Sequence, residues 1–573
     1  MNPRIENPNR LTLPPETTSI LQKLFPTHTR IIIEQALGGG FSLGQVFAVW
    51  PFKEQQVDEL RAVIKMAPSH LIQQEKWAYH TYIDRRLPNK TSLQGEAILE
   101  DLAVGGLLYT LAGWGTFQIE SLYNYLSRVD RQLTKKTMKR LFDSMSELWK
   151  SHQVLQQSFP LQGSYDPILP VNLIVKPLAT RTPSPVNPYH LTPATIADYD
   201  QFEVGSYIQI DGFEISKIEA DPISGQQDVT ITRPHPGNGG LPNSYRIRLQ
   251  FPKAHPLDHY QWGGLLPQPC IGQIVATRNT LLKDSIVQLW GASFNTTQAE
   301  IPLTLSNKTI HLPNPLLAYT IILDQRIEAY LAPIHGDLNL ENILVDSELG
   351  DIRLIDFSDT RYDHILHDLL RLEVGIITRR LPDCLSQVDY HPAVIYRLYE
   401  QLHYQGNQPL TNYPSSWSTE LQTIFDTLFT LRQTARDYLA KHDDYTHYYQ
   451  GLTLYLLGTL KFNNLTPEAK RLAFWGAAIA CYYLQLGDKA LVTENNIYSV
   501  FNIPEPTAIQ TDILSEAVRN LPDQMTILQK RLRQTSSPID QVMAQAALEA
   551  VEQRIADLPK WAIASVKSVC SFL

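Results

Sequence analysis

The chain has 573 residues, which is enough for about two to four domains, each with a sizeable hydrophobic core. Its formal net charge of −9 excludes a global electrostatic drive toward nucleic acid or anionic lipid. The four cysteines are scattered and form no Cys-x-x-Cys pair, which argues against a disulfide framework or a zinc site and favours a reducing compartment.

Membrane insertion and secretion are not expected. Residues 1–8 contain no apolar signal core, and the longest apolar stretches, near 452–460 and 472–486, are too short or too interrupted to cross a bilayer. They predict buried helices instead. We therefore expect a cytoplasmic protein with no membrane partner.

The first motif along the chain is a glycine-rich turn between two predicted strands. The apolar run Ile31–Ile33 precedes Gly38-Gly39-Gly40-Phe41-Ser42, and an alternating run follows. Glycines let backbone amides approach phosphate oxygens closely, so the turn is a candidate phosphate-binding element. Glycine-rich hairpins without a ligand are also common, and this alternative stays open.

A strand that ends in a lysine comes next. Ala62–Lys65 is apolar up to its last residue, and Glu75 follows in a helical pattern with Tyr79 and Ile83. A lone lysine–glutamate pair is usually a surface salt bridge of little value. Two short strands then follow, Ala97–Leu102 and Leu107–Leu111, on either side of a pair of glycines.

The most informative segment begins at His335-Gly336-Asp337. Asp337 and Asn342 are five residues apart, which is the spacing of a kinase catalytic loop. Asp356 follows an apolar run that predicts a strand, and an aspartate at such a strand end can hold a magnesium ion. Asp337 suits the orientation or deprotonation of an incoming hydroxyl, whereas Asn342 and Asp356 supply oxygen ligands for Mg²⁺. His335 is a candidate of the same loop, where bracing explains it better than base catalysis.

Residues 335–357 resemble the Brenner-type motif of the aminoglycoside phosphotransferase and choline-kinase-like group, which has the protein-kinase-like fold. The glycine turn, the lysine strand and the helical glutamate precede this segment in the expected order. The resemblance implies an α+β, bilobal fold with ATP and Mg²⁺ as cofactors. It also implies transfer of the γ-phosphoryl group to a hydroxyl of a small molecule, and less readily of a protein.

The same resemblance assigns roles to the upstream residues. Lys65 contacts the phosphates and Glu75 orients it. A hinge after the second short strand holds adenine through backbone groups. The remaining nucleotide-binding candidates are in the glycine turn and this hinge: Gly39, Gly40, Ser42, Thr110 and Ala112.

Three features refine the resemblance. The glycine spacing departs by one residue from G-x-G-x-x-G and is closer to the Gly-Gly-Phe-Ser form of the phosphotransferase group. Asn339 stands where serine/threonine kinases usually have a lysine, which makes a protein hydroxyl a less favoured acceptor. The run Asp363–Leu372 resembles the segment after the metal site of that group, and we expect Asp368 to anchor the catalytic loop or cap a helix.

A kinase-like core passes quickly from a helix near 136–157 to a helix near 314–330, yet about 150 residues lie between them here. A Pro-rich connector from Pro160 to Pro193 opens this insertion. Short runs bounded by turn residues then predict a small barrel or OB-like sheet. The predicted strands are Tyr207–Ile210, Phe213–Ile218, Val229–Thr232, Tyr245–Phe251, Ile271–Ala276 and Ile286–Trp290.

Basic residues of the insertion allow a second interpretation, a face for single-stranded nucleic acid. The simpler interpretation, which we favour, is that alternating arginines line the wet side of a sheet. The residues concerned are Arg233, Arg246, Arg248, Lys253 and Arg278.

The chain becomes helical after Arg380, with apolar spacing of three and four near 391–405, 417–442, 445–462 and 467–487. Thr466-Pro467-Glu468 predicts a helix start. Acidic residues here would suit a cationic acceptor, and Asp437, Asp443 and Asp444 are candidates, although a solvated cluster is the simpler explanation.

The expected domains are a kinase-like N-lobe (1–113), the start of the C-lobe (114–160), the insertion (161–310) and the C-lobe with its helical extension (311–490). A linker (491–510) leads to a small amphipathic helical module (511–573), which is a possible site for a protein partner.

Three functions stay open at this stage. The first is the phosphotransferase, with a nucleotide and an unidentified hydroxyl acceptor as partners. The second is a catalytically weak, nucleotide-responsive scaffold, because the layout loosely resembles the ternary-complex-associated, kinase-like proteins of bacterial signalling and conflict systems. The third, a nucleic-acid binder, is the least favoured.

Overall fold

The computed structural model describes most of residues 2–486, and we describe only these residues. They are 2–37, 44–53, 61–88, 90–110, 119–178, 187–195, 202–220, 226–234, 245–252, 259–305, 309–348, 350–385, 392–404, 413–414, 417–442 and 444–486. The chain divides into two compact units, 1–402 with 407–485 and 403–406 with 486–573. Almost all of the described residues belong to the first unit. The predicted linker 491–510 and helical module 511–573 lie outside the described residues.

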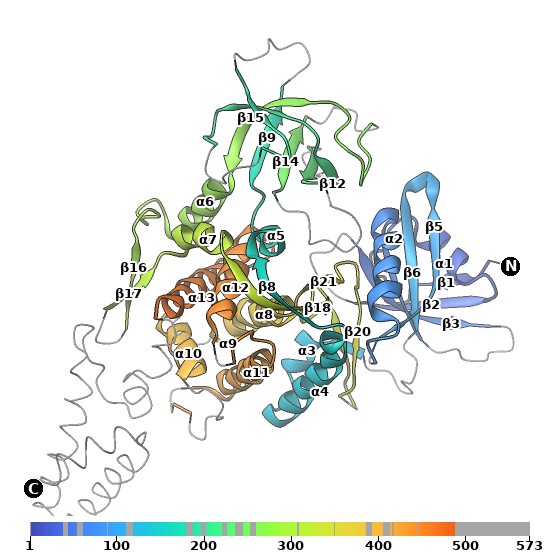
Figure 1. The fold of residues 1–573 in the computed structure, drawn as a ribbon. Helices are drawn as coiled ribbons and strands as arrows, with labels where there is room; N and C mark the ends of the chain where they lie inside the picture. Colours follow the sequence, from blue (N-terminus) through green and yellow to red (C-terminus); the bar gives the residue numbers. More distant parts are fainter. Residues whose placement is uncertain are drawn as a thin grey trace, which may run out of the picture. The chain divides into compact units, whose positions relative to one another are not determined.

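The N-terminal part is a six-stranded sheet in the order β1-β2-β3-β4-β6-β5, drawn in blue in Figure 1. Its strands are β1 (Arg4–Glu6), β2 (Arg30–Leu37), β3 (Gln45–Phe52), β4 (Ala62–Pro68), β5 (Ser92–Leu99) and β6 (Val104–Thr110). The pairs from β2 onward are antiparallel. Helix α1 (Thr17–Leu24) buries Ile20 and Leu21 against the sheet, and α2 (Ser69–Ala78) follows β4 directly.

Two small sheets surround the predicted catalytic loop. One has the order β20-β19-β7, from β7 (Ile119–Ser121), β19 (Ile343–Asp346) and β20 (Ile352–Leu354). The other has the order β21-β18-β8, from β8 (Val154–Pro160), β18 (Arg326–Ile334) and β21 (Arg361–His364). The loop 335–342 leaves β18 and enters β19, so its polar residues are held between strands of both sheets.

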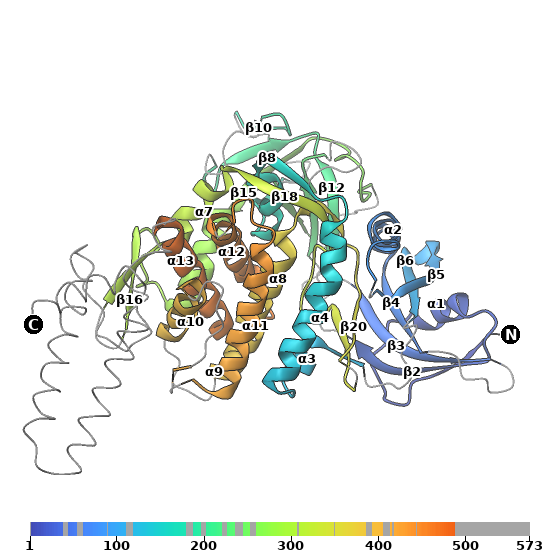
Figure 2. The same ribbon diagram turned by 60° about the horizontal axis from the view of Figure 1, so that its bottom comes forward.

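The rest of the C-terminal part is helical, as expected. Helix α3 (Leu122–Leu126) precedes α4 (Arg131–Lys150), and α4 lies beside α11 (Thr419–Arg436) in both views (Figure 2). The other helices are α8 (Leu366–Gly375), α9 (Leu381–Leu385), α10 (Ala393–Tyr404), α12 (Thr446–Gly458) and α13 (Pro467–Leu486). The predicted start of α13 is confirmed, because Thr466 Oγ1 accepts the Ala469 N–H at 3.2 Å. No helix in this part of the chain is long and apolar enough to cross a membrane.

The insertion contains a seven-stranded sheet, which we call the inserted sheet, in the order β10-β11-β15-β9-β14-β13-β12. Its strands are β9 (Leu173–Pro177), β10 (Tyr189–Leu191), β11 (Tyr207–Ile210), β12 (Glu214–Ala220), β13 (Gln227–Thr232), β14 (Ile247–Phe251) and β15 (Cys270–Thr277). An OB-like barrel is not confirmed. Two pairs, β10–β11 and β9–β14, are parallel, and among the described residues no ladder joins β10 to β12.

Three predicted boundaries are wrong for local reasons. Residues 286–290 are the end of helix α6 (Arg278–Trp290), because Thr277 and Thr280 form a capping box that starts a helix before the apolar run. The helix predicted at 136–157 ends at Lys150, and His152, with a φ of 56°, turns the chain into β8. The helix predicted at 314–330 is α7 (Pro315–Leu323), after which β18 buries every second residue from Ile327 to Leu331.

The elements between these parts are short. Helix α5 (Leu161–Tyr165) and the 3-10 turn η3 (Asp166–Ile168) lead into the inserted sheet, and the hairpin β16 (Glu300–Thr304) with β17 (Thr309–Pro313) precedes α7. Strand β8 enters the insertion, β18 leaves it, and the two pair antiparallel. The described residues therefore have a mixed α/β architecture with a helical C-terminal region, as the motifs predict.

Candidate functional site

A buried ion-pair cluster connects the N-terminal sheet to the catalytic segment. The Nζ atom of Lys65, on β4, lies 2.6 Å from Glu75 Oε2 on α2 and 2.5 Å from Asp356 Oδ1 after β20. Lys65, Glu75 and Asp356 are 3%, 0% and 6% exposed. Three residues from separate regions of the sequence thus meet around one ammonium group.

The carboxylate oxygen of Glu75 that does not contact Lys65 also accepts hydrogen bonds. Glu75 Oε1 accepts the Tyr109 hydroxyl at 2.7 Å and the Phe357 N–H at 3.2 Å. Tyr109 lies on β6, so the glutamate is fixed by the sheet on one side and by the residue after Asp356 on the other. Such a fixed carboxylate keeps the lysine in one position, which is what a phosphate-binding lysine needs.

The charges of the cluster stabilise one another against the cost of burial. Burial lowers the pKa of the Lys65 ammonium, but the negative charges of Glu75 and Asp356 outweigh it, so the pKa is raised. Burial raises the pKa of the Asp356 carboxyl, but the positive charge of Lys65 outweighs it, so the pKa is lowered. Both groups are therefore charged near neutral pH.

Asp356 adopts an unusual backbone conformation. Its φ is 66°, in the left-handed region that residues with a side chain rarely occupy. The Ser358 hydroxyl donates to its Oδ1 at 2.8 Å, and Lys65 bonds to the same oxygen. Strain of this kind concentrates at functional sites, where the surrounding contacts hold it in place.

Asp337 is the centre of the predicted catalytic loop, and three side chains hold it. Arg371, on α8, donates its Nε–H to Asp337 Oδ1 at 2.6 Å. Asn339 and Asn342 donate their side-chain amides to Asp337 Oδ2 at 2.9 Å and 3.1 Å. The carboxylate is therefore oriented and partly accessible, with 27% of its side chain exposed.

Asn342 and Asp356 lie at the same end of one hairpin. The Ile355 N–H donates to the Asn342 carbonyl at 3.1 Å, next to the ladder between β19 and β20. No group of three or more His, Cys, Asp or Glu suited to a metal occurs among the residues that the structure describes. Magnesium fits the pair nevertheless, because it binds through one or two protein oxygens and completes its shell with phosphate and water.

His335 braces the loop. Its ring nitrogen Nε2 lies 3.1 Å from the Ile355 carbonyl, and its backbone N–H donates to Asp368 Oδ2 at 2.9 Å. Asp368 also accepts the Gly336 N–H at 2.9 Å and the Trp149 indole N–H at 2.9 Å. Asp368 therefore anchors the catalytic loop to α4 and α8, as the sequence predicts.

The other nucleotide-site candidates are less fully described. Thr110 is the last residue of β6, paired with Ala62 at the start of the lysine strand. Gly39, Gly40, Ser42 and Ala112 lie outside the described residues.

Three residues of the site escaped the sequence analysis. Tyr109 and Arg371 carry no motif of their own, and only the fold brings them to Glu75 and Asp337. Asp359 is exposed, yet the pKa of its carboxyl is raised, first by local desolvation and then by the charges of Asp337 and Asp356. Asp359 therefore lies close enough to Asp337 and Asp356 to feel their charges.

A small cavity lies beside the catalytic loop. It is lined by Asn339, Leu340, Arg371, Gly375, Thr378, Arg379, Thr459, Phe462 and Leu465. Two arginines line this cavity and no acidic side chain does. Of the acidic candidates for a cationic acceptor, neither Asp437 nor Asp444 lines this cavity, and Asp444 accepts the Thr446 N–H at 3.0 Å. Asp443 lies outside the described residues.

The basic residues of the insertion do not form one open face. Arg278 is buried and bonds to Asp166 and Asn172. Arg246 donates to the Leu169 carbonyl at 2.5 Å. Lys253 lies outside the described residues. Because Arg246 and Arg278 bond within the protein, the nucleic-acid interpretation loses two of its basic residues.

Several solved structures are similar to the chain at low sequence identity. The structure of an amicoumacin kinase in complex with AMP-PNP, Ca²⁺ and Ami is 9% identical, and the match covers 81% of this chain and 92% of that chain with a TM-score of 0.29. An aminoglycoside phosphotransferase in complex with ADP and hygromycin B is 10% identical, covers 81% and 98%, and has a TM-score of 0.32. A putative aminoglycoside phosphotransferase from Ralstonia eutropha is 7% identical, covers 82% and 99%, and has a TM-score of 0.31.

Comparison with curated proteins gives no significant match. The profile of a family described as "Ternary complex associated domain 9" matches residues 30–461, which is more than half of the chain and includes the whole ion-pair cluster and the catalytic loop. The chain therefore belongs to the ternary complex associated domain 9 family.

Proposed function

We propose that the protein is an ATP- and Mg²⁺-dependent phosphotransferase that transfers the γ-phosphoryl group to a hydroxyl of a small molecule. The observation that carries this proposal is the buried Lys65 ammonium held between Glu75 and Asp356. A lysine so placed steadies nucleotide phosphates, and the aspartate beside it is suited to a metal ion.

Each residue has a role that follows from its contacts. Asp337, oriented by Arg371 and two asparagines, accepts the proton of the acceptor hydroxyl or orients it. Asn342 and Asp356 would hold Mg²⁺, which would neutralise negative charge on the nucleotide phosphates. Positioning and electrostatic stabilisation are the main contributions that phosphoryl transfer requires from a protein.

The test pairs binding with turnover. In Asp337→Asn, we expect binding of Mg-ATP to persist, as measured by thermal shift, while transfer to a panel of hydroxyl acceptors and slow ATP hydrolysis are lost. Glu341→Gln is the matched control, because Glu341 lies on the same loop but pairs with Arg379. The assignment fails if Asp337→Asn turns over as fast as the unchanged protein.

A nucleotide-responsive scaffold is a second candidate, favoured by the description of the matched family. It shares the buried lysine cluster and predicts binding of Mg-ATP with no transfer to any acceptor. The same pair of measurements therefore separates the two functions.

A further inference from the structure

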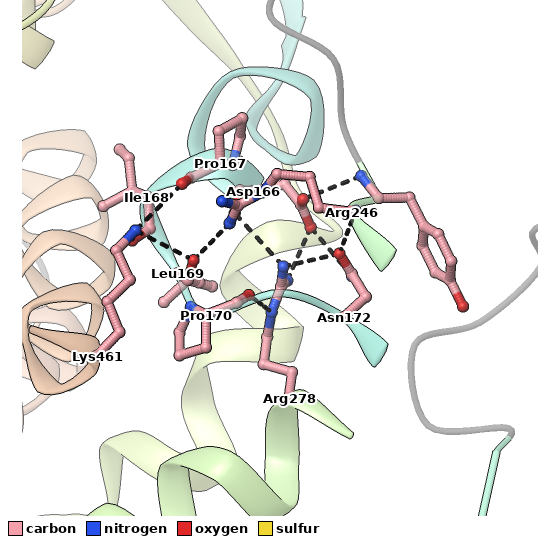
Figure 3. Close-up of polar contacts among 10 residues, drawn as sticks. Asp166, Pro167, Ile168, Leu169, Pro170, Asn172, Arg246, Arg278 and Lys461 are labelled. Carbon is pink, nitrogen blue, oxygen red and sulfur yellow. Dashed lines mark hydrogen bonds and ion pairs between the residues drawn. The ribbon is translucent and has the colours of Figure 1, made fainter. Parts of the chain in front are cut away.

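The inserted sheet is fixed to the helical C-terminal part by a buried polar cluster, which we call the anchor: Asp166, Asn172, Arg246, Arg278 and Lys461 (Figure 3). Arg278 bonds to Asp166 Oδ1 at 2.7 Å, to Asn172 Oδ1 at 2.9 Å and to the Pro170 carbonyl at 2.8 Å. Asp166 is fully buried, and its Oδ2 accepts the Tyr245 N–H at 3.0 Å.

Lys461 ties this cluster to the helices. It lies in the turn η5 (Thr459–Lys461) after α12, and its ammonium donates to the Ile168 carbonyl at 2.6 Å. Longer contacts reach the Leu169 carbonyl at 3.3 Å and the Pro167 carbonyl at 3.4 Å. Lys461 and Arg246 are half-buried, whereas Asp166, Asn172 and Arg278 are buried. The sheet therefore cannot pivot at this point without breaking several charged hydrogen bonds.

A second contact joins the inserted sheet to the N-terminal part. The ring of Trp262 stacks on the ring of His70, with centroids 5.0 Å apart and planes inclined by 28°. His70 is the second residue of α2, the helix that carries Glu75. Trp262 is 42% exposed, so it contributes little to the core of the sheet.

A continuous set of hydrogen bonds connects these two contacts. The segment after Trp262 pairs with the start of β12, through Gly263 N–H to Ile215 O and Ile215 N–H to Gly264 O, both at 2.8 Å. Strand β12 pairs with β13, and β13 with β14. Arg246, next to β14, belongs to the anchor, so a rigid ladder runs from the tryptophan to the C-terminal part.

We propose that the inserted sheet is a brace that sets the position of α2, with Trp262 and His70 as positioning residues for the Lys65–Glu75 pair. This inference deepens the proposed function and rests on it. Besides the stack, α2 is held by its packing against β4 and β6 and by the contacts of Glu75. Gln74 adds a further bond, in which its amide donates to the Ser358 carbonyl at 2.9 Å. Because Glu75 must remain within 2.6 Å of Lys65, a small displacement of the helix removes the lysine from its working position.

The brace also gives the inserted sheet a way to influence the nucleotide site. A molecule that breaks the contacts of the anchor would free the sheet and so move Trp262 and, through His70, the glutamate helix. Coupling of this kind is reciprocal, so bound nucleotide would in turn hold the sheet in place.

The decisive variant is Trp262→Ala. We expect amide hydrogen exchange in residues 69–83 to increase and affinity for Mg-ATP to weaken by roughly threefold to tenfold, the range of an aromatic pair. Trp262→Phe keeps a stacking ring and should restore both. Trp77→Ala is the matched control, because it removes a 51% exposed tryptophan of the same helix that contacts Tyr82 of the following turn.

The second variant tests the far end of the brace. Lys461→Met removes the ammonium from the anchor and should raise exchange in α2 in the same way, although Lys461 touches no residue of that helix among its described contacts. Combining Lys461→Met with Trp262→Ala should add little to either change, because both break one connection.

The outcomes are distinct. The brace is refuted if Trp262→Ala leaves exchange in α2 no greater than Trp77→Ala does, whatever happens to nucleotide binding. If the unchanged protein binds no Mg-ATP, the proposed function fails, whereas hydrogen exchange in α2 still decides whether the sheet positions the helix. Unaltered exchange within residues 207–232 shows that the sheet remains folded in the variant.

Discussion

At the scale of single residues, the site depends on groups that no motif reveals. Tyr109 holds one oxygen of Glu75 while Lys65 holds the other. Losing any hydrogen bond to this buried carboxylate should destabilise the folded state, because a charged oxygen without a partner in the interior is unfavourable in free energy.

Tyr109→Phe tests this dependence. It removes one hydroxyl and leaves the ring among its neighbours, so we expect unfolding free energy to fall by about 1.5–3 kcal/mol, the value of a hydrogen bond to a charged group. Mg-ATP affinity should fall as well, because Glu75 is less fixed. Urea unfolding and calorimetric titration measure the two effects, with Tyr123→Phe as a control for loss of an exposed tyrosine hydroxyl bonded to Asp383.

Gly336 is a second residue whose identity the geometry dictates. Its φ is 84°, and an added Cβ would lie 2.0 Å from the Asp359 carbonyl oxygen. Gly336→Ala should therefore displace the loop between His335 and Asp337 and abolish transfer. Gly95→Ala, where nothing lies within 4 Å of the added carbon, should leave transfer unchanged. Equal activity of the two variants would contradict the strain argument.

At the scale of elements, a buried arginine ties three helices of the C-terminal part together. Arg432 on α11 bonds to Glu373 on α8 at 2.7 Å and 3.2 Å. Tyr448 on α12 donates its hydroxyl to the same glutamate, and the guanidinium lies 5.5 Å from the centre of the Tyr448 ring. Since α8 also carries Arg371 and Asp368, this pair supports the helix that holds the catalytic loop.

Removing one partner of this ion pair should lower the unfolding free energy. Arg432→Met leaves Glu373 buried without its cation, and we expect a loss of about 3–5 kcal/mol in unfolding free energy. The double variant Arg432→Met with Glu373→Gln should lose less than the sum of the single variants, because no lone charge remains. A double-mutant cycle from urea unfolding measures the difference. Additive losses would show that the two side chains act independently.

At the scale of the whole molecule, the sequence predicts the kinase-like order because its motifs are local. Lys65, Glu75, Asp337, Asn342 and Asp356 each follow a short pattern, and the fold brings all five to the expected elements. The contacts between these residues and distant segments are not predicted in this way. The distances from Lys65 to Asp356 and from Arg371 to Asp337 depend on pairings between distant segments, which no local pattern encodes.

The strand order of the insertion was not predicted, because two of its strands carry only a weak signal in the sequence. Short apolar runs correctly identify β11 to β15, and β11 and β14 bury every second side chain against one core. The number and order of strands are set by β9 and β10, which lie in the Pro-rich connector and carry a weak strand signal. Because β9 inserts between β14 and β15, the expected small barrel becomes a mixed sheet of seven strands.

Acid stability is the last property of the whole fold that the structure predicts. His364 and His367 are buried between β21, α5 and α12, where His367 bonds to the Ser164 and Tyr455 hydroxyls and His364 to the Tyr165 hydroxyl. Burial lowers the pKa of His364 to about 3 and that of His367 to about 4. The unfolded chain, with histidine pKa values near about 6.5, therefore binds more protons than the folded one between about pH 6.5 and about pH 4.

Stability should consequently decrease as the pH falls through this window, by at most about 1.4 kcal/mol per pH unit for each histidine. Carboxyl groups whose pKa is lowered, such as that of Asp166, add their loss only at lower pH, because their ordinary pKa is near about 4. Urea unfolding between about pH 7 and about pH 4.5 measures the slope. His367→Gln retains hydrogen-bonding capacity without a titrating ring. It should reduce the dependence of unfolding free energy on pH by the contribution of one bound proton. An unchanged slope would assign the acid sensitivity to other groups.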